Sequence, residues 1–129
     1  MMTSLKELQD DIIKQYRIKI NENSNCYRRT HAHRKTRTIC KWKQLSSIKS
    51  TFTLLHEIGH IENNNSSMRR CEQEYYATQW ALEKCKELNI EVPDDIVSRY
   101  QKYVYDELDR GLRRNGQGYP SREEMTLIK

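Results

Sequence analysis

Residues 51–60 read TFTLLHEIGH, and this stretch decides the fold expected for the chain. Apolar side chains recur around it with helical spacing from about residue 46, among them Ile48, Phe52 and Leu55. His56 and His60 stand four residues apart, so a helix places both imidazoles on one face, about 6 Å apart. Both rings can therefore reach one zinc ion, for which imidazole nitrogen is a common ligand.

Glu57 completes an HExxH pattern within this helix. A carboxylate beside a zinc-bound water can take the proton of that water and later pass it to a leaving amine. Zinc lowers the pKa of such a water to near 7, so hydroxide becomes available at neutral pH. The pattern indicates a peptidase with Glu57 as its catalytic base, and the plain alternative is a helix with two solvent-facing histidines.

A catalytic zinc also needs a third protein ligand. No histidine follows His60, so a carboxylate must serve, and the next helical segment offers Glu72 and Glu74. If the two helices pair antiparallel about a turn near residue 65, position 74 lies opposite position 56. Glu74 also falls on the apolar seam of its helix, where an acid is costly unless it meets a cation. We expect Glu74 to be the ligand, while Glu72 remains open and an ordinary surface acid is the plain alternative.

The N-terminal part of the chain predicts a helix followed by a small sheet. Ser4 with Glu7 forms a capping-box pattern that opens a helix through about residue 15. Alternating side chains predict strands over residues 16–20 and 37–42, the second at a sheet edge, with turn residues over 21–25. His31 and His33 lie two apart on an extended stretch and share a face, as substrate contacts or as exposed strand residues.

The C-terminal part predicts two more helices and a tail. Ser66 or Ser67 is expected to cap a helix that runs through about residue 88, and Pro93 to open a third long helix. Residues 113–120 are expected to form a mobile connector, after which Ser121 and Glu124 cap a short last helix. The whole is expected to be a single α+β domain over residues 1–129. Its parts are an N-terminal helix and strands (1–45), the HExxH and third-ligand helices (46–88), and a C-terminal helix with tail (93–129).

Composition bounds the class of protein. The 129 residues are 36% hydrophobic and 32% charged, and no apolar run is long enough to cross a membrane. The first twenty residues lack the apolar centre of a secretion signal, so we expect a cytoplasmic protein. Four cysteines without a close pair favour reduced thiols, and we do not expect them to bind metal because zinc cysteines usually come in close pairs.

A basic block covers residues 26–50. This segment has no acidic residue although the net charge of the chain is only +5. Such a block favours an acidic partner, either a peptide, a protein surface or nucleic acid, while a solvated face is the alternative. A substrate peptide could also pair with the strand near residues 36–42.

Residues 51–60, with EYYATQWA at 74–81, resemble the ImmA/IrrE family of zinc peptidases. Members of that family show F-T-L-x-H-E-x-G-H followed by E-x-x-A-x-x-F-A on the next helix. The resemblance covers roughly residues 36–81 and implies a zincin-like minimal metallopeptidase core, in which His56, His60 and Glu74 bind Zn²⁺ and Glu57 is the general base. Thr78 departs from the family, which usually carries Asn or Asp there to support a zinc ligand.

The function expected from these observations is a zinc-dependent endopeptidase in the cytoplasm of a bacterial or phage-infected host cell. It would act on a specific protein substrate, such as a phage or host transcriptional regulator, by Glu57-assisted attack of a zinc-bound water. The alternative is a non-catalytic binding module that docks residues 26–50 on nucleic acid or an acidic protein. The ligand set by itself also admits another divalent metal.

Overall fold

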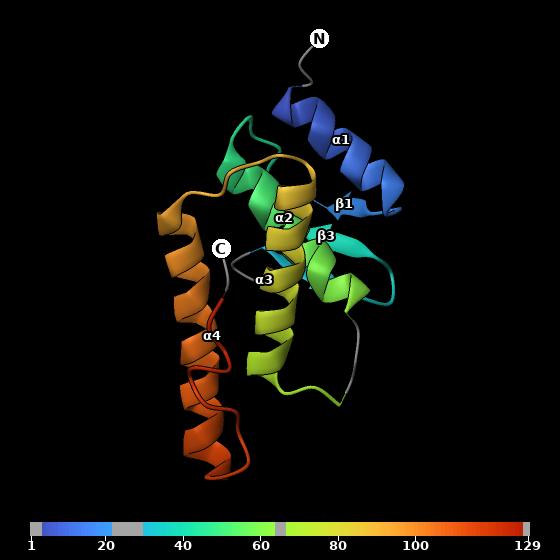
Figure 1. Ribbon diagram of the computed structural model, residues 1–129. Helices are drawn as coiled ribbons and strands as arrows, with labels where there is room; N and C mark the ends of the chain where they lie inside the picture. Colours follow the sequence, from blue (N-terminus) through green and yellow to red (C-terminus); the bar gives the residue numbers. More distant parts are fainter. Residues whose placement is uncertain (1–3, 22–29, 64–66, 128–129) are drawn as a thin grey trace.

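Helices packed against a small sheet make up the α+β structure of this chain, as expected. The computed structural model describes residues 4–21, 30–63 and 67–127, and Figure 1 shows their arrangement. The elements in chain order are α1 (Leu5–Gln15), β1 (Lys19–Asn21), β2 (His31–His33), β3 (Thr38–Cys40), α2 (Ile48–Glu62), α3 (Arg70–Glu87) and α4 (Asp94–Asn115). Among the described helices, none is long and apolar enough to cross a membrane.

The sheet has the strand order β1-β3-β2, with β1 parallel and β2 antiparallel to β3. Residue Ile39 of β3 pairs with Ile20 on one side and Ala32 on the other. The strand predicted at a sheet edge is therefore the central one, and it cannot add a substrate peptide. Side-chain alternation reports which face of a strand is buried, but it carries no information on the neighbours of that strand.

The first predicted strand is also shorter than expected. Strand β1 begins at Lys19 because the chain leaves α1 through Arg17, whose φ of 54° is left-handed and closes a turn. The backbone N–H of Arg17 donates to the carbonyl of Lys14, 3.2 Å away. The turn expected over residues 21–25 falls mostly outside the described residues.

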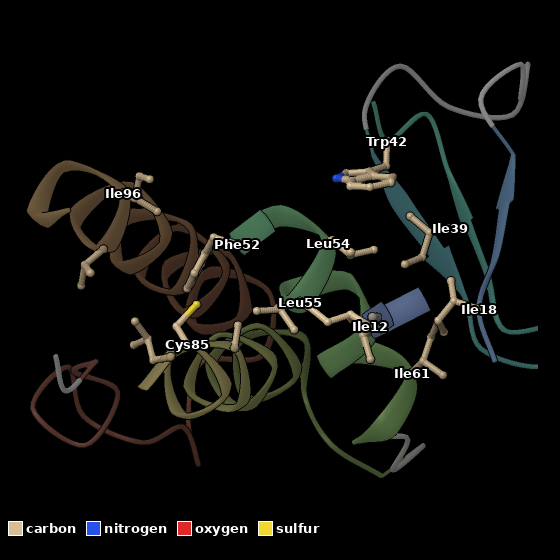
Figure 2. Packing of buried hydrophobic residues seen from close by; sticks show 14 of the residues in the cluster. Ile12, Ile18, Ile39, Trp42, Phe52, Leu54, Leu55, Ile61, Cys85 and Ile96 are labelled. Atoms are coloured by element: carbon tan, nitrogen blue, oxygen red, sulfur yellow. The ribbon is translucent and has the colours of Figure 1, made fainter. Parts of the chain in front are cut away.

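Helix α2 lies between the sheet and helix α3, and the main hydrophobic core surrounds it. Figure 2 shows Ile39 and Trp42 on the side of the strands, facing Leu54 of α2, with Phe52 and Cys85 on the other side of the helix. The indole N–H of Trp42 donates to the carbonyl of Ser50, 2.9 Å away, so this ring also ties the start of α2 to the sheet. A helix buried on two sides can hold its polar residues rigidly.

Of two predicted helix starts, the structure confirms the first and corrects the second. The Ser4 hydroxyl accepts from the backbone N–H of Glu7 at 3.1 Å, which confirms the first cap. Helix α3, however, begins after Arg69 rather than after a serine, because the loop continues through Ser67 and the following residue. Ser66 lies outside the described residues.

The C-terminal tail packs on α4 instead of forming a free connector. Helix α4 continues to Asn115 and ends at Gly116, whose φ of 73° suits glycine. Beyond it, Met125 and Leu127 are buried, and the Gln101 amide donates to the carbonyl of Met125 at 2.9 Å. The expected connector over residues 113–120 is therefore helical over its first three residues.

The last predicted helix is a single turn. The Ser121 hydroxyl accepts from the N–H of Glu124 at 3.2 Å, and the Glu124 carboxylate accepts from the N–H of Ser121 at 3.1 Å. The capping box forms, but the turn that follows it ends at Met125 and does not continue as a helix.

Candidate metal centre

Helix α2 carries both histidines of the HExxH pattern on the side that faces α3. The rings of His56 and His60 have centroids 4.7 Å apart and stand nearly perpendicular. His56 is buried, with 5% of its surface exposed, because α2 is enclosed by its neighbours. The i, i+4 spacing thus brings the two imidazoles together as predicted.

Glu74 of α3 meets both imidazoles. Its Oε2 lies 3.1 Å from Nε2 of His56, and its Oε1 lies 3.2 Å from Nε2 of His60. The antiparallel pairing of α2 and α3 therefore places position 74 opposite the histidine pair, as the sequence predicts. Two ligands of a tetrahedral zinc ion stand about 3.3 Å apart for metal–ligand distances near 2.0 Å. The observed spacing is compatible with that value.

The close approach of α2 and α3 depends on a glycine. A Cβ built at Gly59 would lie 2.6 Å from the carbonyl oxygen of Ala77. Any side chain at position 59 would force the helices apart, and Glu74 would then move away from the histidines. Glycine in the middle of a helix usually costs stability. The close contact with Ala77 explains why a glycine stands at position 59 despite that cost.

Glu72 serves a different role from Glu74. Its carboxylate accepts a hydrogen bond from the backbone N–H of Arg69 at 3.2 Å and pairs with the guanidinium of the same residue. These contacts stabilise the first turn of α3, where a negative charge is favoured. The structure therefore brings Glu74, and not Glu72, to the histidines.

Glu57 lies beside the histidine pair. Its Oε1 is 3.3 Å from Nδ1 of His56, and only 9% of its side chain is exposed. The candidate ligand atoms of His56, Glu57 and His60 all lie within 4.8 Å of one another. A carboxylate at this position is close enough to exchange a proton with a molecule bound between the histidines.

The histidines and acids of the centre shift the pKa values of one another. Burial alone would lower the pKa of His56, but its hydrogen bonds to Glu57 and Glu74 outweigh burial and raise that pKa to about 9. Burial would likewise raise the pKa of Glu74, yet its hydrogen bonds to both histidines lower it well below the usual value. The ion pairs of Glu74 among the described residues are to these two histidines, so its largely buried negative charge is balanced by imidazole protons.

The donor set fits zinc. Two imidazoles and one carboxylate on neighbouring helices form a common ligand set of catalytic zinc sites, and His56, His60 and Glu74 supply it. A divalent ion would replace the imidazole protons as the positive partner of the buried acids. The structure thus provides residues that could bind a metal, without identifying which metal.

Tyr100 of α4 forms a wall of the centre that the sequence did not reveal. Its ring lies 4.6 Å from the His56 ring and 4.9 Å from the Phe52 ring, centroid to centroid. Burial raises the pKa of its hydroxyl to about 12, and this hydroxyl lies 3.3 Å from the Thr53 hydroxyl. On sequence alone, Tyr100 belongs to an apolar stripe of α4 and carries no further signal.

The described hydrogen bond of the Thr78 hydroxyl goes to the backbone and not to the side chain of a candidate ligand. The hydroxyl of this buried residue donates to the backbone carbonyl of Glu74 at 2.8 Å, one turn earlier in α3. This bond holds the backbone from which the Glu74 side chain projects.

Part of the basic block is used inside the fold. The Arg37 guanidinium donates to the carbonyl of Tyr16 through Nη2 at 2.7 Å and pairs with the carboxylate of Glu62. Arg37 thus ties the β2–β3 turn to the ends of α1 and α2. Arg28 and Arg29 lie outside the described residues, while Lys35, Lys43 and Lys49 are exposed to solvent.

Comparison with known proteins found no match among protein-family models, curated proteins or solved structures. The resemblance to a peptidase family therefore rests on the two short sequence motifs alone.

Proposed function

We propose that this chain is a zinc-dependent endopeptidase with a zincin-like core of the ImmA/IrrE type. The observation that carries the proposal is that Glu74 of α3 meets His56 and His60 of α2 through its two oxygens, at 3.1 and 3.2 Å. A surface acid without a role would not be expected between the buried His56 ring and the partly buried His60 ring. The same three residues follow from the HExxH pattern and from the antiparallel pairing of the helices.

The residues of the centre would have different roles in peptide hydrolysis. His56, His60 and Glu74 would bind the zinc ion. Zinc supplies Lewis acidity, which lowers the pKa of water and polarises a carbonyl group. Glu57 would accept a proton from the attacking water and donate it to the amine that leaves the cleaved bond. Its buried position next to His56 limits competing contact with solvent.

Strand β2 offers a place for the substrate backbone. It is antiparallel to β3, contacts α2, and among the described residues pairs with β3 alone. An extended peptide could add to its outer edge by main-chain hydrogen bonds. Amide hydrogen exchange in residues 31–33 should slow when a substrate peptide binds, and unchanged exchange there would exclude this placement.

The experiment compares the zinc-loaded chain with its Glu57→Gln variant, which has the same shape but no base. Both proteins are incubated with a cell extract, and newly formed protein N-termini are identified by mass spectrometry. We expect new N-termini with the unchanged chain only, at equal zinc content. The substrate class that we propose is a regulatory protein, such as a phage or host transcriptional regulator.

A failure to detect cleavage would contradict the proposed peptidase activity. If both proteins bind zinc and neither yields new N-termini in any extract, including one from phage-infected bacteria, the chain is a metal-binding module. The basic segment would then be the next candidate, although Arg37 already has partners within the fold. Binding of nucleic acid by that segment would weaken steeply with added salt.

A further inference from the structure

A second group of metal-binding side chains lies on the sheet. His31 and His33 belong to β2, and Cys40 belongs to the neighbouring strand β3. The antiparallel register pairs His31 with Cys40, so these two side chains point to the same face of the sheet. Residue His33 joins them because residues two apart on a strand share a face.

This face is separate from the main core. Ile39 of β3 is fully buried among core residues, and Ala32 opposite it packs on the same cluster. The alternation of strands directs the neighbours of these two residues to the other face. The group of His31, His33 and Cys40 is therefore a site of its own, on different elements from the centre formed by α2 and α3.

The distances within the group suit a metal. Nε2 of His31 lies 3.2 Å from Nε2 of His33, close to the separation of about 3.3 Å between two imidazole ligands of a tetrahedral zinc ion. The candidate ligand atoms of all three residues lie within 4.8 Å of one another. A sulfur and a nitrogen ligand of zinc stand about 3.6 Å apart, so the thiol needs to move by about 1 Å at most.

The kinds of donor narrow the choice of metal. Two imidazoles and a thiolate favour zinc, cobalt or copper over magnesium and calcium, which prefer oxygen. Cys40 is buried, with 2% of its surface exposed, and it is not part of a disulfide. The close pairs that zinc cysteines usually form in sequence are absent here, but pairing of the strands supplies the partners instead.

We propose that His31, His33 and Cys40 bind a second zinc ion, which joins β2 to β3. Each strand has only three residues, so main-chain pairing alone holds them by few hydrogen bonds. A metal bound across the two strands would stabilise the sheet against which α2 packs. The site is structural in this proposal, and it holds whether or not the chain cleaves a protein.

The test uses cobalt(II) as a probe on the purified full chain. A cobalt–thiolate bond gives a charge-transfer absorption band in the near ultraviolet, whereas the centre of His56, His60 and Glu74 contains no sulfur. We expect this band at one equivalent in the unchanged chain, and its loss in Cys40→Ser and in His33→Ala. Zinc content should fall from two ions to one in the same variants.

Matched controls separate the two sites and the effects of folding. Cys85 is as deeply buried as Cys40 but packs in the main core, so Cys85→Ala should keep the band. His60→Ala should keep it as well, while it loses the other metal. Circular dichroism of each variant checks that the helices are intact.

Several results would overturn the proposal. A chain without the thiolate band, a band that survives Cys40→Ser, or equal loss of the band in Cys85→Ala would each do so. The same variants test the centre of His56, His60 and Glu74 independently. If the chain binds one zinc ion, and that ion is lost in Cys40→Ser but kept in His60→Ala, the strand site is supported and the peptidase centre is refuted.

Discussion

Gly59 of α2 lies against Ala77 of α3 so closely that a methyl group at Gly59 would stand 2.6 Å from the Ala77 carbonyl oxygen. This contact sets the separation of the helices that carry the candidate ligands. Gly59 precedes His60 in the chain, and Ala77 lies one turn beyond Glu74. The close packing of the two backbones and the geometry of the candidate metal centre are thus parts of the same arrangement.

The first prediction concerns Gly59→Ala. Helix propensity alone would favour alanine by about 1 kcal/mol, but the clash with backbone atoms of α3 should cost more, for a net loss of about 1–3 kcal/mol. Zinc affinity should fall together with stability because Glu74 moves away from the histidines. Urea unfolding and zinc titration measure the two effects.

Gly111→Ala is the matched control for that substitution. A Cβ at Gly111 would also meet a neighbour closely, but the neighbour is the side-chain ring of Tyr119, which can move. Stability should change little and zinc affinity not at all. If Gly59→Ala behaved like Gly111→Ala, the close contact of α2 and α3 would not be what positions the centre.

The second prediction compares the two acids of α3. Glu74→Ala removes a candidate ligand and should lower zinc affinity at least a hundredfold, whereas Glu72→Ala should leave it unchanged. Loss of the Glu72 carboxylate should instead weaken the start of α3 by about 1 kcal/mol, since it accepts from the Arg69 N–H. Zinc titration and thermal unfolding of both variants distinguish these outcomes, and a large affinity loss with Glu72→Ala would contradict the assignment.

The third prediction concerns Tyr100, which contacts the His56 ring. Tyr100→Phe keeps the ring and loses only the hydroxyl near Thr53, so zinc affinity should be retained. Tyr100→Ala removes the wall, should destabilise the chain by about 3 kcal/mol, and should weaken zinc binding because His56 becomes less constrained. Equal zinc affinity in both variants would show that the ring does not position His56.

The positions of the candidate ligands could be predicted from the sequence because both of their determinants are local. The spacing of His56 and His60 needs only a helix, and the position of Glu74 needs only a short antiparallel turn between two helices. Helical periodicity was strong in both segments. The same periodicity favours Glu74 over Glu72 as the third ligand, because Glu74 falls on the apolar seam of its helix and Glu72 does not.

The sheet was less predictable for a physical reason. Strands of three residues carry little pattern, and the pairing of β1 with β3 joins residues that are about twenty positions apart. The register that places His31 opposite Cys40 is likewise a property of tertiary structure. A cluster formed by strand pairing therefore cannot be recognised from the spacing of its residues along the chain.

The last prediction uses the pKa of Cys85, which burial raises to about 12 from an unperturbed value of 9.0. Well below pH 9 the thiol is neutral in both states, so its contribution to stability is complete there. As the pH rises from 9 towards 12, the unfolded chain loses this proton and the folded chain keeps it, so stability falls. At pH 10 the loss should be about 1.4 kcal/mol relative to pH 8.

The variant Cys85→Ala isolates this effect, because it lacks the thiol and keeps the other titrating groups. The stability difference between the unchanged chain and Cys85→Ala, measured by urea unfolding, should therefore shrink by about 1.4 kcal/mol between pH 8 and pH 10. A difference that stayed constant over this range would mean that the thiol titrates alike in both states. It would then be accessible to water, contrary to its 1% exposure in the core between α2, α3 and α4.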